Sequence, residues 1–313
     1  MQPIQHVAIL GAGAMGAVYA SLFFKMDPTC VAFVAKGDRA QRLNDQGVIV
    51  NGTQYLIPVL PPEDPAPPSD LILVAVKHHH LVEALPDLKT RVGEHTLILS
   101  VMNGLDSEDM IGARYGADKV LYAVAVGIDA LREENRVVYT KQGKLFFGEA
   151  RNPMLSECVK RVQEIFDRAG IVYEIPEDMR RILWWKFMIN VGVNQASAVL
   201  GAPFGMFHKS EEARALMESA MREVMALAQA AEVNLVEEDI TNWYAFLFTL
   251  SPHGKTSMLQ DLEAGRKTEV EIFAGKVVEL GKLYGIPTPV NQTLLRIIHV
   301  LESGGPNTYQ GLR

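Results

Sequence analysis

A glycine-rich segment near the N-terminus constrains the fold of this chain more than any other feature. Gly11, Gly13 and Gly16 form the pattern G-x-G-x-x-G in GAGAMG, directly after the apolar run HVAIL and before a segment with helical spacing. In a strand–turn–helix unit the first glycine allows the tight turn and the second lets the backbone approach a pyrophosphate. The third permits close packing of the helix on the strand. The predicted cofactor-binding residues of this loop are Gly11, Ala12, Gly13, Ala14, Met15 and Gly16. A glycine-rich turn that binds no nucleotide is the alternative.

The rest of the N-terminal half alternates β-type runs with helical segments. VAFVA, DLILVAV and HTLILSV are rich in Val, Ile and Leu, as expected of strands in a parallel sheet that is buried on both faces. VLYAVAVGIDALR adds a strand, and the alternating segment VVYTKQGKLFFGE predicts a hairpin around Gln142 and Gly143. Strands that alternate with helices predict an α/β sheet with right-handed crossovers.

The pattern changes near residue 176, after which apolar residues recur with the period of a helix. We therefore predict the α/β fold class, with an N-terminal Rossmann-type dinucleotide-binding domain over residues 1–176 and an all-α C-terminal domain over residues 177–313. The proline-rich segment 58–70 predicts a loop between two strands rather than a docking peptide.

The end of the second predicted strand indicates which dinucleotide is bound. An acidic residue there would hold the ribose 2′-hydroxyl of NAD, whereas a cation accepts the 2′-phosphate of NADP. The chain has Lys36 at the strand end and Arg39 close behind, in AKGDR, so NADP(H) is favoured. Asp38 lies between them and could serve the hydroxyl, and both cations could instead be solvated loop charges.

One segment of the helical half, WWKFMINVGVNQASAVLG (residues 184–201), carries polar residues in apolar surroundings. Lys186, Asn190 and Asn194 are four residues apart, and steps of four advance about 40° around an α-helix, so they share one narrow stripe. A buried ammonium without a partner costs several kcal/mol, and an unpaired buried amide about 1–3 kcal/mol. Either partners or a cleft must face the stripe. Alternatively, Lys186 is a helix-end cation that reaches water.

With these residues in view, the chain resembles the ketopantoate reductase (2-dehydropantoate 2-reductase) family over essentially its whole length. The resemblance depends on GAGAMG, VAVK at 74–77, MNG at 102–104, the KxxxNxxxN stripe and TSMLQDLEAGRKTE at 256–269. It implies a Rossmann-type NADP-binding domain followed by a helical substrate and catalytic domain, with NADPH and a 2-keto acid meeting between them. The implied reaction is the NADPH-dependent reduction of ketopantoate to pantoate in pantothenate and coenzyme A biosynthesis.

The resemblance also implies roles for individual residues. Lys186 matches the catalytic lysine beside the ketone oxygen, where an ammonium stabilises developing negative charge and donates a proton. Glu269 matches an acidic residue that helps to hold the hydroxyl side of the substrate and balances the lysine, near the cofactor. The implied substrate-binding residues are Asn103, Asn190, Asn194 and Ser257, and the further implied cofactor contacts are Lys77, Asn103 and Glu269.

Each of these residues also has a structural interpretation. Glu269 could belong to an exposed charged helix face, and Ser257 could be a helix N-cap. Asn103 could serve only a turn with Gly104.

Two departures from the family pattern concern the substrate. Met102 stands where many family members have Gln before Asn-Gly. Phe204 and Gly205 lie where well-studied members present another substrate-binding asparagine. A more apolar pocket wall would favour another branched 2-keto acid as well as ketopantoate. The other readings are a β-hydroxyacid-type dehydrogenase and a non-catalytic NADPH sensor.

Composition and charge exclude some partners. A net charge of −7 and a pI near 5.7 argue against nucleic acid, and no apolar run approaches the roughly 20 residues of a membrane span. Cys30 and Cys158 are expected to be free thiols in a reducing cytoplasm. His78–His80 are expected to be loop residues, and no metal site is predicted. The apolar segment NWYAFLF at 242–248 could pack internally or across the interface of a homodimer. We favour the homodimer.

Overall fold

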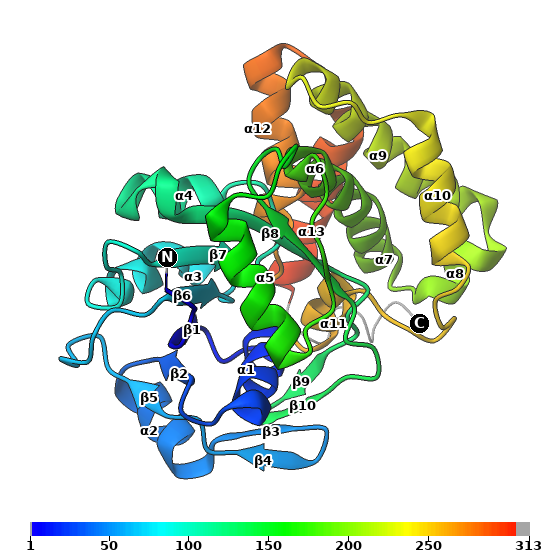
Figure 1. Cartoon of the computed structure of the whole chain (residues 1–313). Coiled ribbons are helices and arrows are strands. Elements are labelled where there is room, and N and C mark those ends of the chain that lie inside the picture. Colours follow the sequence, from blue (N-terminus) through cyan, green and yellow to red (C-terminus); the bar gives the residue numbers. More distant parts are fainter. Residues whose placement is uncertain (1, 305–313) are drawn as a thin grey trace. The chain divides into compact units, whose positions relative to one another are not determined.

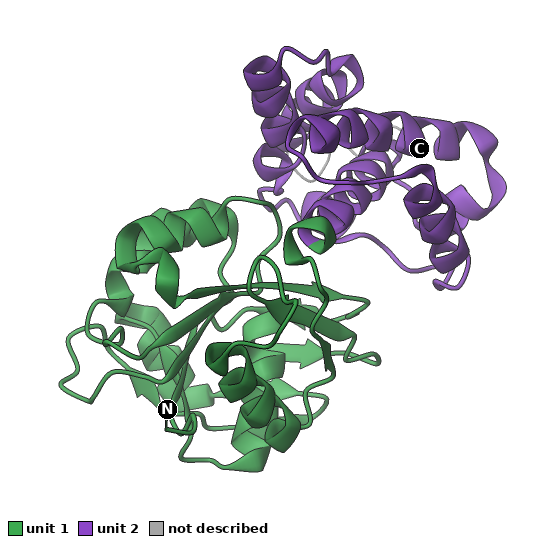
Figure 2. Ribbon diagram, turned by 45° about the horizontal axis from the view of Figure 1, so that its top comes forward, with its two compact units in different colours: residues 1–182 green, residues 183–313 purple. Residues whose placement is uncertain are grey.

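The apolar run before the glycines is strand β1 (Val7–Leu10), which lies inside an eight-stranded sheet with the order β12-β11-β8-β7-β6-β1-β2-β5. The structure, a computed structural model, describes residues 2–304. The chain divides into two units, Met1–Ile182 and Leu183–Arg313, and each is described by itself (Figure 2). The sheet belongs to the first unit.

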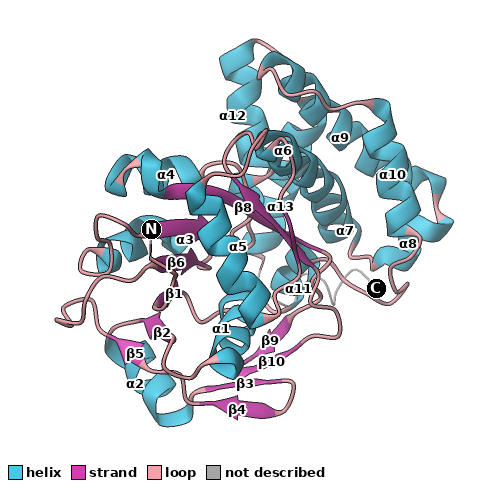
Figure 3. Ribbon diagram, viewed as in Figure 1, coloured by secondary structure: helices cyan, strands magenta, loops and turns pink. Residues whose placement is uncertain are grey.

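Neighbouring strands of this sheet run parallel, except β8 and β11, which pair antiparallel. Since β1 connects to β2 on one side and β6 lies on its other side, the chain reverses direction across the sheet at β1. The other strands are β2 (Val31–Val34), β5 (Val59–Leu60), β6 (Leu71–Val74), β7 (Leu97–Ser100), β8 (Val120–Val126), β11 (Lys144–Gly148) and β12 (Tyr173–Glu174). The α/β class predicted from the sequence is confirmed (Figures 1 and 3).

Alternate residues of the central strands enter two separate cores. Val7 and Ile9 of β1 belong to a core that includes residues of α1 (Ala14–Met26) and α5 (Glu157–Ala169). Ala8 and Leu10 belong to a core with residues of α3 (His78–Ala84) and α4 (Ser107–Tyr115). Both faces of the strands are therefore buried, which is why their sequences are continuous apolar runs. His78–His80, predicted to lie in a loop, form the first turn of α3 instead.

A second, four-stranded sheet has the order β4-β3-β10-β9 and follows α2 (Gly37–Gln46) in the chain. Its strands are β3 (Val48–Val50), β4 (Thr53–Tyr55), β9 (Leu131–Glu133) and β10 (Arg136–Val138). The predicted hairpin around Gln142 and Gly143 is wrong: β10 pairs with β9 and β3, whereas β11 pairs with β8 and β12 in the other sheet. The two segments flanking that turn thus enter different sheets.

Between residues 179 and 304 the regular secondary structure is helical. The long helix α9 packs against α7, α8, α12, α13 and a π-helical turn at Asn190–Asn194. Its N-terminus is capped by Ser210, whose hydroxyl accepts the Ala213 N–H at 3.2 Å. The helices are α6 (Met179–Ile189), α7 (Gln195–Leu200), α8 (Phe204–Lys209), α9 (Glu211–Ala230), α10 (Glu237–Leu247), α11 (Ser257–Glu263), α12 (Ala274–Tyr284) and α13 (Pro289–Ser303). None of the helices within residues 2–304 is long and apolar enough to cross a bilayer.

Candidate functional site

The glycine-rich loop has the geometry of a phosphate cradle. Gly11 has φ +107°, and a Cβ there would lie 2.6 Å from the Ala75 carbonyl oxygen. A Cβ at Gly16 would lie 1.8 Å from the Gly11 carbonyl oxygen, so the close approach of α1 to the turn requires glycine. Backbone packing therefore explains both positions.

Gly13 differs from the other two glycines. Its φ is −74°, and a Cβ there would lie 3.7 Å from the nearest atom, an ordinary contact. The protein itself thus leaves room for a Cβ at Gly13, and its absence keeps the N-terminus of α1 open. Within the described chain no side chain caps α1, so its first N–H groups can donate to an anion. The loop fits the pyrophosphate of a dinucleotide.

The other candidate cofactor residues follow strands that end at the same edge of the sheet. The register pairs Leu10 with Val34 and with Val74, and Val74 with Ser100, so β1, β2, β6 and β7 end level. Lys36, Lys77 and Asn103 come two to three residues after these ends. Ligands of open α/β sheets bind at this carboxyl edge, where the strand order reverses. The structure thus brings Lys36, Lys77 and Asn103 to the edge that carries Gly11.

Lys36 and Arg39, the two predicted ligands of a 2′-phosphate, have different surroundings. The Lys36 ammonium is exposed and donates to Asp87 Oδ1 at 2.7 Å, which raises its pKa. Desolvation lowers the pKa of Arg39, and the nearby Arg42 lowers it further. Desolvation also lowers the pKa of Arg132 on β9, as do the positive charges of Arg39 and Arg42. Arg42 and Arg132, which the sequence did not single out, add positive charge around Arg39.

The buried carboxyl group of Glu108 is connected by hydrogen bonds to the segment that carries Asn103. The Ser107 hydroxyl donates to Glu108 Oε2 at 2.9 Å and lies 2.7 Å from the Ser100 hydroxyl. Ser100 Oγ in turn accepts the Met102 N–H at 3.4 Å. Burial raises the pKa of Glu108 to about 7. This hydrogen-bonded chain joins α4 to the residue before Asn103, and the sequence offered no periodic signal for it.

In the second unit, Lys186 lies near the C-terminal end of α6 and is half-buried. Desolvation lowers its pKa from the ordinary 10.5 to about 8. A lysine that simply reached into water would keep an ordinary pKa. Lys186 at neutral pH is therefore a cation that gives up its proton more readily than a surface lysine, which suits a proton donor.

A π-helical turn improves the alignment of the polar stripe. On a regular α-helix Asn194 would be rotated by about 80° from Lys186, twice the drift of one four-residue step. Residues Asn190–Asn194 instead form a π-helix, whose wider i→i+5 turn makes four residues fall about 30° short of a full circle. The rotation of about −30° from Asn190 to Asn194 therefore offsets most of the rotation of about +40° from Lys186 to Asn190. Asn190 and Asn194 are 4% and 7% exposed.

Ser257 and Glu269 both belong to the second unit. Ser257 is the first residue of α11, which packs against α7 and the π-helical turn. The N-cap is Thr256, whose hydroxyl accepts the Leu259 N–H at 3.3 Å, so the capping interpretation of Ser257 is wrong. Glu269, which is 9% exposed, precedes the 3₁₀ turn Val270–Ile272 and is not on an exposed helix face.

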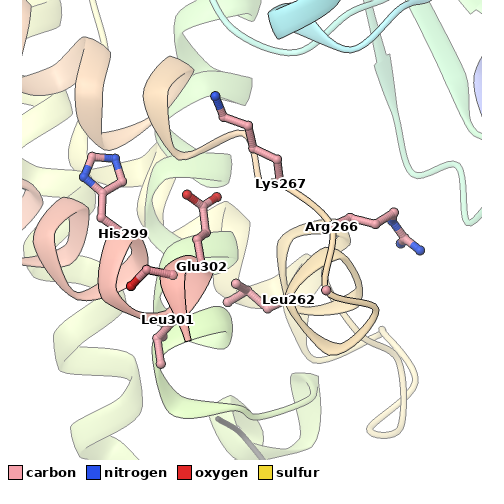
Figure 4. A pocket seen from close by; sticks show the side chains of 8 residues that line it. Leu262, Arg266, Lys267, His299, Leu301 and Glu302 are labelled. Carbon is pink, nitrogen blue, oxygen red and sulfur yellow. The ribbon is translucent and has the colours of Figure 1, made fainter. Parts of the chain in front are cut away.

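A cavity of about 410 Å³ opens beside α11 and α13. Figure 4 shows Lys267 and Arg266 on one side of it and His299 and Glu302 on α13. Glu302 is tied to the chain, because its Oε1 accepts the Thr268 N–H at 2.8 Å and the Thr268 hydroxyl at 2.7 Å. The cavity is lined by Leu262, Gly265, Arg266, Lys267, His299, Leu301, Glu302 and Ser303, none of them a predicted site residue.

Two family models together match most of this chain. A family model described as "Ketopantoate reductase PanE/ApbA" matches residues 7–152, and one described as "Ketopantoate reductase PanE/ApbA C terminal" matches residues 178–302. A 2-dehydropantoate 2-reductase from Archaeoglobus fulgidus is 31% identical over 96% of this chain and 99% of its own.

Solved structures show the same fold. A 2-dehydropantoate 2-reductase from Geobacter metallireducens is 26% identical with a TM-score of 0.83, covering 94% of this chain and 99% of its own. D-mandelate dehydrogenase, solved with NADH and anilino(oxo)acetate, has a TM-score of 0.86 at 20% identity, over 96% and 98% of the two chains. The family matches, the relative at 31% identity and the geometry of the glycine loop lead to one conclusion: this chain belongs to the ketopantoate reductase family.

Proposed function

We propose that this chain reduces the 2-keto group of ketopantoate to the hydroxyl group of pantoate with NADPH, the family's step in pantothenate biosynthesis. The full-length relatives named 2-dehydropantoate 2-reductase support this function. The observation that carries it is the half-buried Lys186 with its lowered pKa, in line with the buried amides Asn190 and Asn194. A protein that only sensed NADPH would need no such proton donor.

NADPH, when bound, supplies the hydride that is added to C2 of the keto acid. The residues of this chain bind, orient and protonate the substrate. The Lys186 ammonium stabilises the negative charge that develops on the ketone oxygen and donates the proton that completes the hydroxyl group. The amine regains a proton from water after the product leaves.

We assign the remaining substrate contacts to residues that can hydrogen-bond a carboxylate, a carbonyl or a hydroxyl group. Asn190 and Asn194 orient the substrate along the stripe, and Ser257 binds its carboxylate. Glu269 accepts from the hydroxyl side and balances the charge of the lysine. Asn103 contacts both the substrate and the nicotinamide end of the cofactor.

Apart from Glu269, the cofactor contacts are assigned to residues 1–176, which we propose as the NADP-binding domain, with residues 177–313 as the substrate domain. The loop Gly11–Gly16 holds the pyrophosphate on the N-terminus of α1. Arg39 and Lys36 bind the 2′-phosphate. To do so, Lys36 gives up its hydrogen bond to Asp87. Lys77, the residue before α3, contacts the cofactor at the same sheet edge.

The test is NADPH oxidation by purified protein with ketopantoate, followed by absorbance. We expect turnover, and we expect Lys186→Ala to lose at least about a hundredfold in kcat, within the range of general acid catalysis. NADPH binding, measured by fluorescence, should be unchanged in that variant. Undiminished turnover by Lys186→Ala would contradict the assignment.

A substrate panel separates the remaining readings. The panel contains ketopantoate, other branched 2-keto acids and β-hydroxy acids, each assayed with NADPH or NADP⁺. If kcat/KM is highest with a different 2-keto acid, that acid is the substrate and the proposed mechanism still holds. If kcat/KM is highest with a β-hydroxy acid, the protein is a β-hydroxyacid-type dehydrogenase instead. Tight NADPH binding without any turnover would favour the sensor.

We further propose that the enzyme is a cytoplasmic homodimer. Cys30 and Cys158 are free thiols, which fits a reducing compartment. Met206, Phe246 and Phe248 of the α8–α10 region are between 40% and 52% exposed, and a structure of a dimeric ketopantoate reductase from Staphylococcus aureus shares the fold. Light scattering after gel filtration should give twice the monomer mass, and Phe248→Glu should lower it.

A further inference from the structure

The π-helical turn in the polar stripe is held by a glutamine that follows it. Gln195 is the first residue of α7 and is 0% exposed. Its side-chain Nε2 donates to the Val191 carbonyl oxygen at 2.7 Å and to Asn291 Oδ1 at 3.0 Å. Its Oε1 accepts the Ala274 N–H at 3.0 Å. One buried side chain thus connects the π-helical turn to the first residue of α12 and to α13.

The bond to Val191 occurs where the helix departs from α geometry. In a regular α-helix the Val191 carbonyl would accept the backbone N–H of Gln195, four residues later. Here the backbone N–H of Gln195 is directed to the Gly192 carbonyl, and the side chain of Gln195 donates to Val191 instead. Gly192 lies three residues before Gln195, so the backbone N–H has moved away from its α-helical acceptor, and the side-chain amide supplies the Val191 carbonyl with a donor in its place.

The partner of Gln195 is itself fixed. Asn291, also 0% exposed, donates from Nδ2 to the Ala220 carbonyl at 3.2 Å and to Glu223 Oε2 at 2.7 Å. The Glu223 carboxylate on α9 also accepts the N–H groups of Val290 and Asn291, at 2.7 and 3.0 Å, in the first turn of α13. Gln195 is therefore anchored to the N-terminal turns of α12 and α13 and, through Asn291, to α9.

We propose that Gln195, anchored by Asn291, is a positioning residue that maintains the π-helical turn and thereby keeps Asn190 and Asn194 in line with Lys186. The inference rests on the proposed function, because it assigns the alignment to keto acid binding and reduction. Without the side-chain donor the Val191 carbonyl is free to accept the backbone N–H of Gln195 again, the turn returns to α geometry, and Asn194 rotates away from the line of Lys186. Asn194 then no longer faces the substrate that Lys186 protonates.

The test compares Gln195→Met, which keeps length and volume but cannot hydrogen-bond, with Leu247→Ala in the core of α10 as a stability control. Both variants should lower the unfolding temperature. Gln195→Met alone should lower kcat/KM for the keto acid at least about tenfold, while the Kd for NADPH stays within about twofold. Asn291→Leu should reproduce the kinetic loss of Gln195→Met.

Hydrogen exchange gives a readout that does not depend on turnover. The backbone amides of residues 192–195 should exchange at least about tenfold faster in Gln195→Met than in the wild type or in Leu247→Ala. Unchanged exchange there, or a kinetic loss no greater than that of Leu247→Ala, would overturn the positioning role. If the wild type turns over no keto acid, the proposed function fails, and the exchange data still decide whether Gln195 maintains the turn.

Discussion

At the scale of single residues, Lys186 predicts how the rate depends on pH. Desolvation lowers the pKa of its ammonium to about 8, so the proton donor is present below this pH and is lost above it. We expect kcat/KM for the keto acid to be level at neutral pH and to fall about tenfold per pH unit above about pH 8. The measurement is a kcat/KM profile from about pH 6 to about pH 10.

Lys186→Arg supplies the control for this profile. Arginine stays protonated over the whole range, so the variant should be slower at neutral pH but should lose the alkaline fall. A wild-type profile that stays level to about pH 10 would show that the Lys186 ammonium does not donate the proton.

The sequence singled out candidate site residues, but it did not predict the contacts that they make in the structure. The glycine pattern predicted the turn and the close approach at Gly16, because these depend on neighbouring residues. The partner of Lys36 is Asp87, which follows α3, and nothing in AKGDR indicates that pair. Arg132 approaches Arg39 from a strand of the second sheet, so no local motif could have included it.

At the scale of elements, Glu108 makes the stability of the first unit depend on pH. Burial raises its pKa from 4.5 to about 7, so the folded state holds a proton that the unfolded chain releases above about pH 4.5. The part of the free energy of unfolding that comes from this bound proton is therefore fully present below about pH 4.5 and is lost as the pH rises through about 7. The shift corresponds to about 3 kcal/mol.

Urea unfolding at two pH values tests this carboxyl group. We expect Glu108→Gln, which stays neutral, to be more stable than the wild type at about pH 8 and to show a smaller loss between about pH 5 and about pH 8. Equal pH dependence in the two proteins would mean that Glu108 is ionised in the folded state.

Elements were predictable where their signal is local. Apolar runs marked β1, β2, β6 and β7, since strands buried on both faces need them. The residue types of Gln142 and Gly143 predicted a hairpin, but residue types do not determine which strands pair: β10 pairs with β9, and β11 pairs with β8. The π-helical turn left no periodic signal, because it depends on Gln195 and on Asn291, ninety-six residues later.

At the scale of the whole molecule, the two units divide the chemistry: the glycine loop lies in one, and Lys186 and its asparagines lie in the other. Cofactor binding should then stabilise the chain without help from Lys186. NADPH at about one hundred times its Kd should raise the free energy of unfolding by about 2.7 kcal/mol, in the wild type and in Lys186→Ala alike.

The variant Gly13→Val tests whether the stabilisation by NADPH depends on the glycine-rich loop. A Cβ at Gly13 meets only an ordinary contact at 3.7 Å, so the variant should fold and lose at most about 1 kcal/mol from its weaker helix cap. Its side chain would occupy the open N-terminus of α1, so the stabilisation by NADPH should disappear. Gly16→Val places a Cβ 1.8 Å from the Gly11 carbonyl and should fail to fold at all. If Gly13→Val kept the full NADPH effect, the pyrophosphate would have to bind elsewhere than at α1.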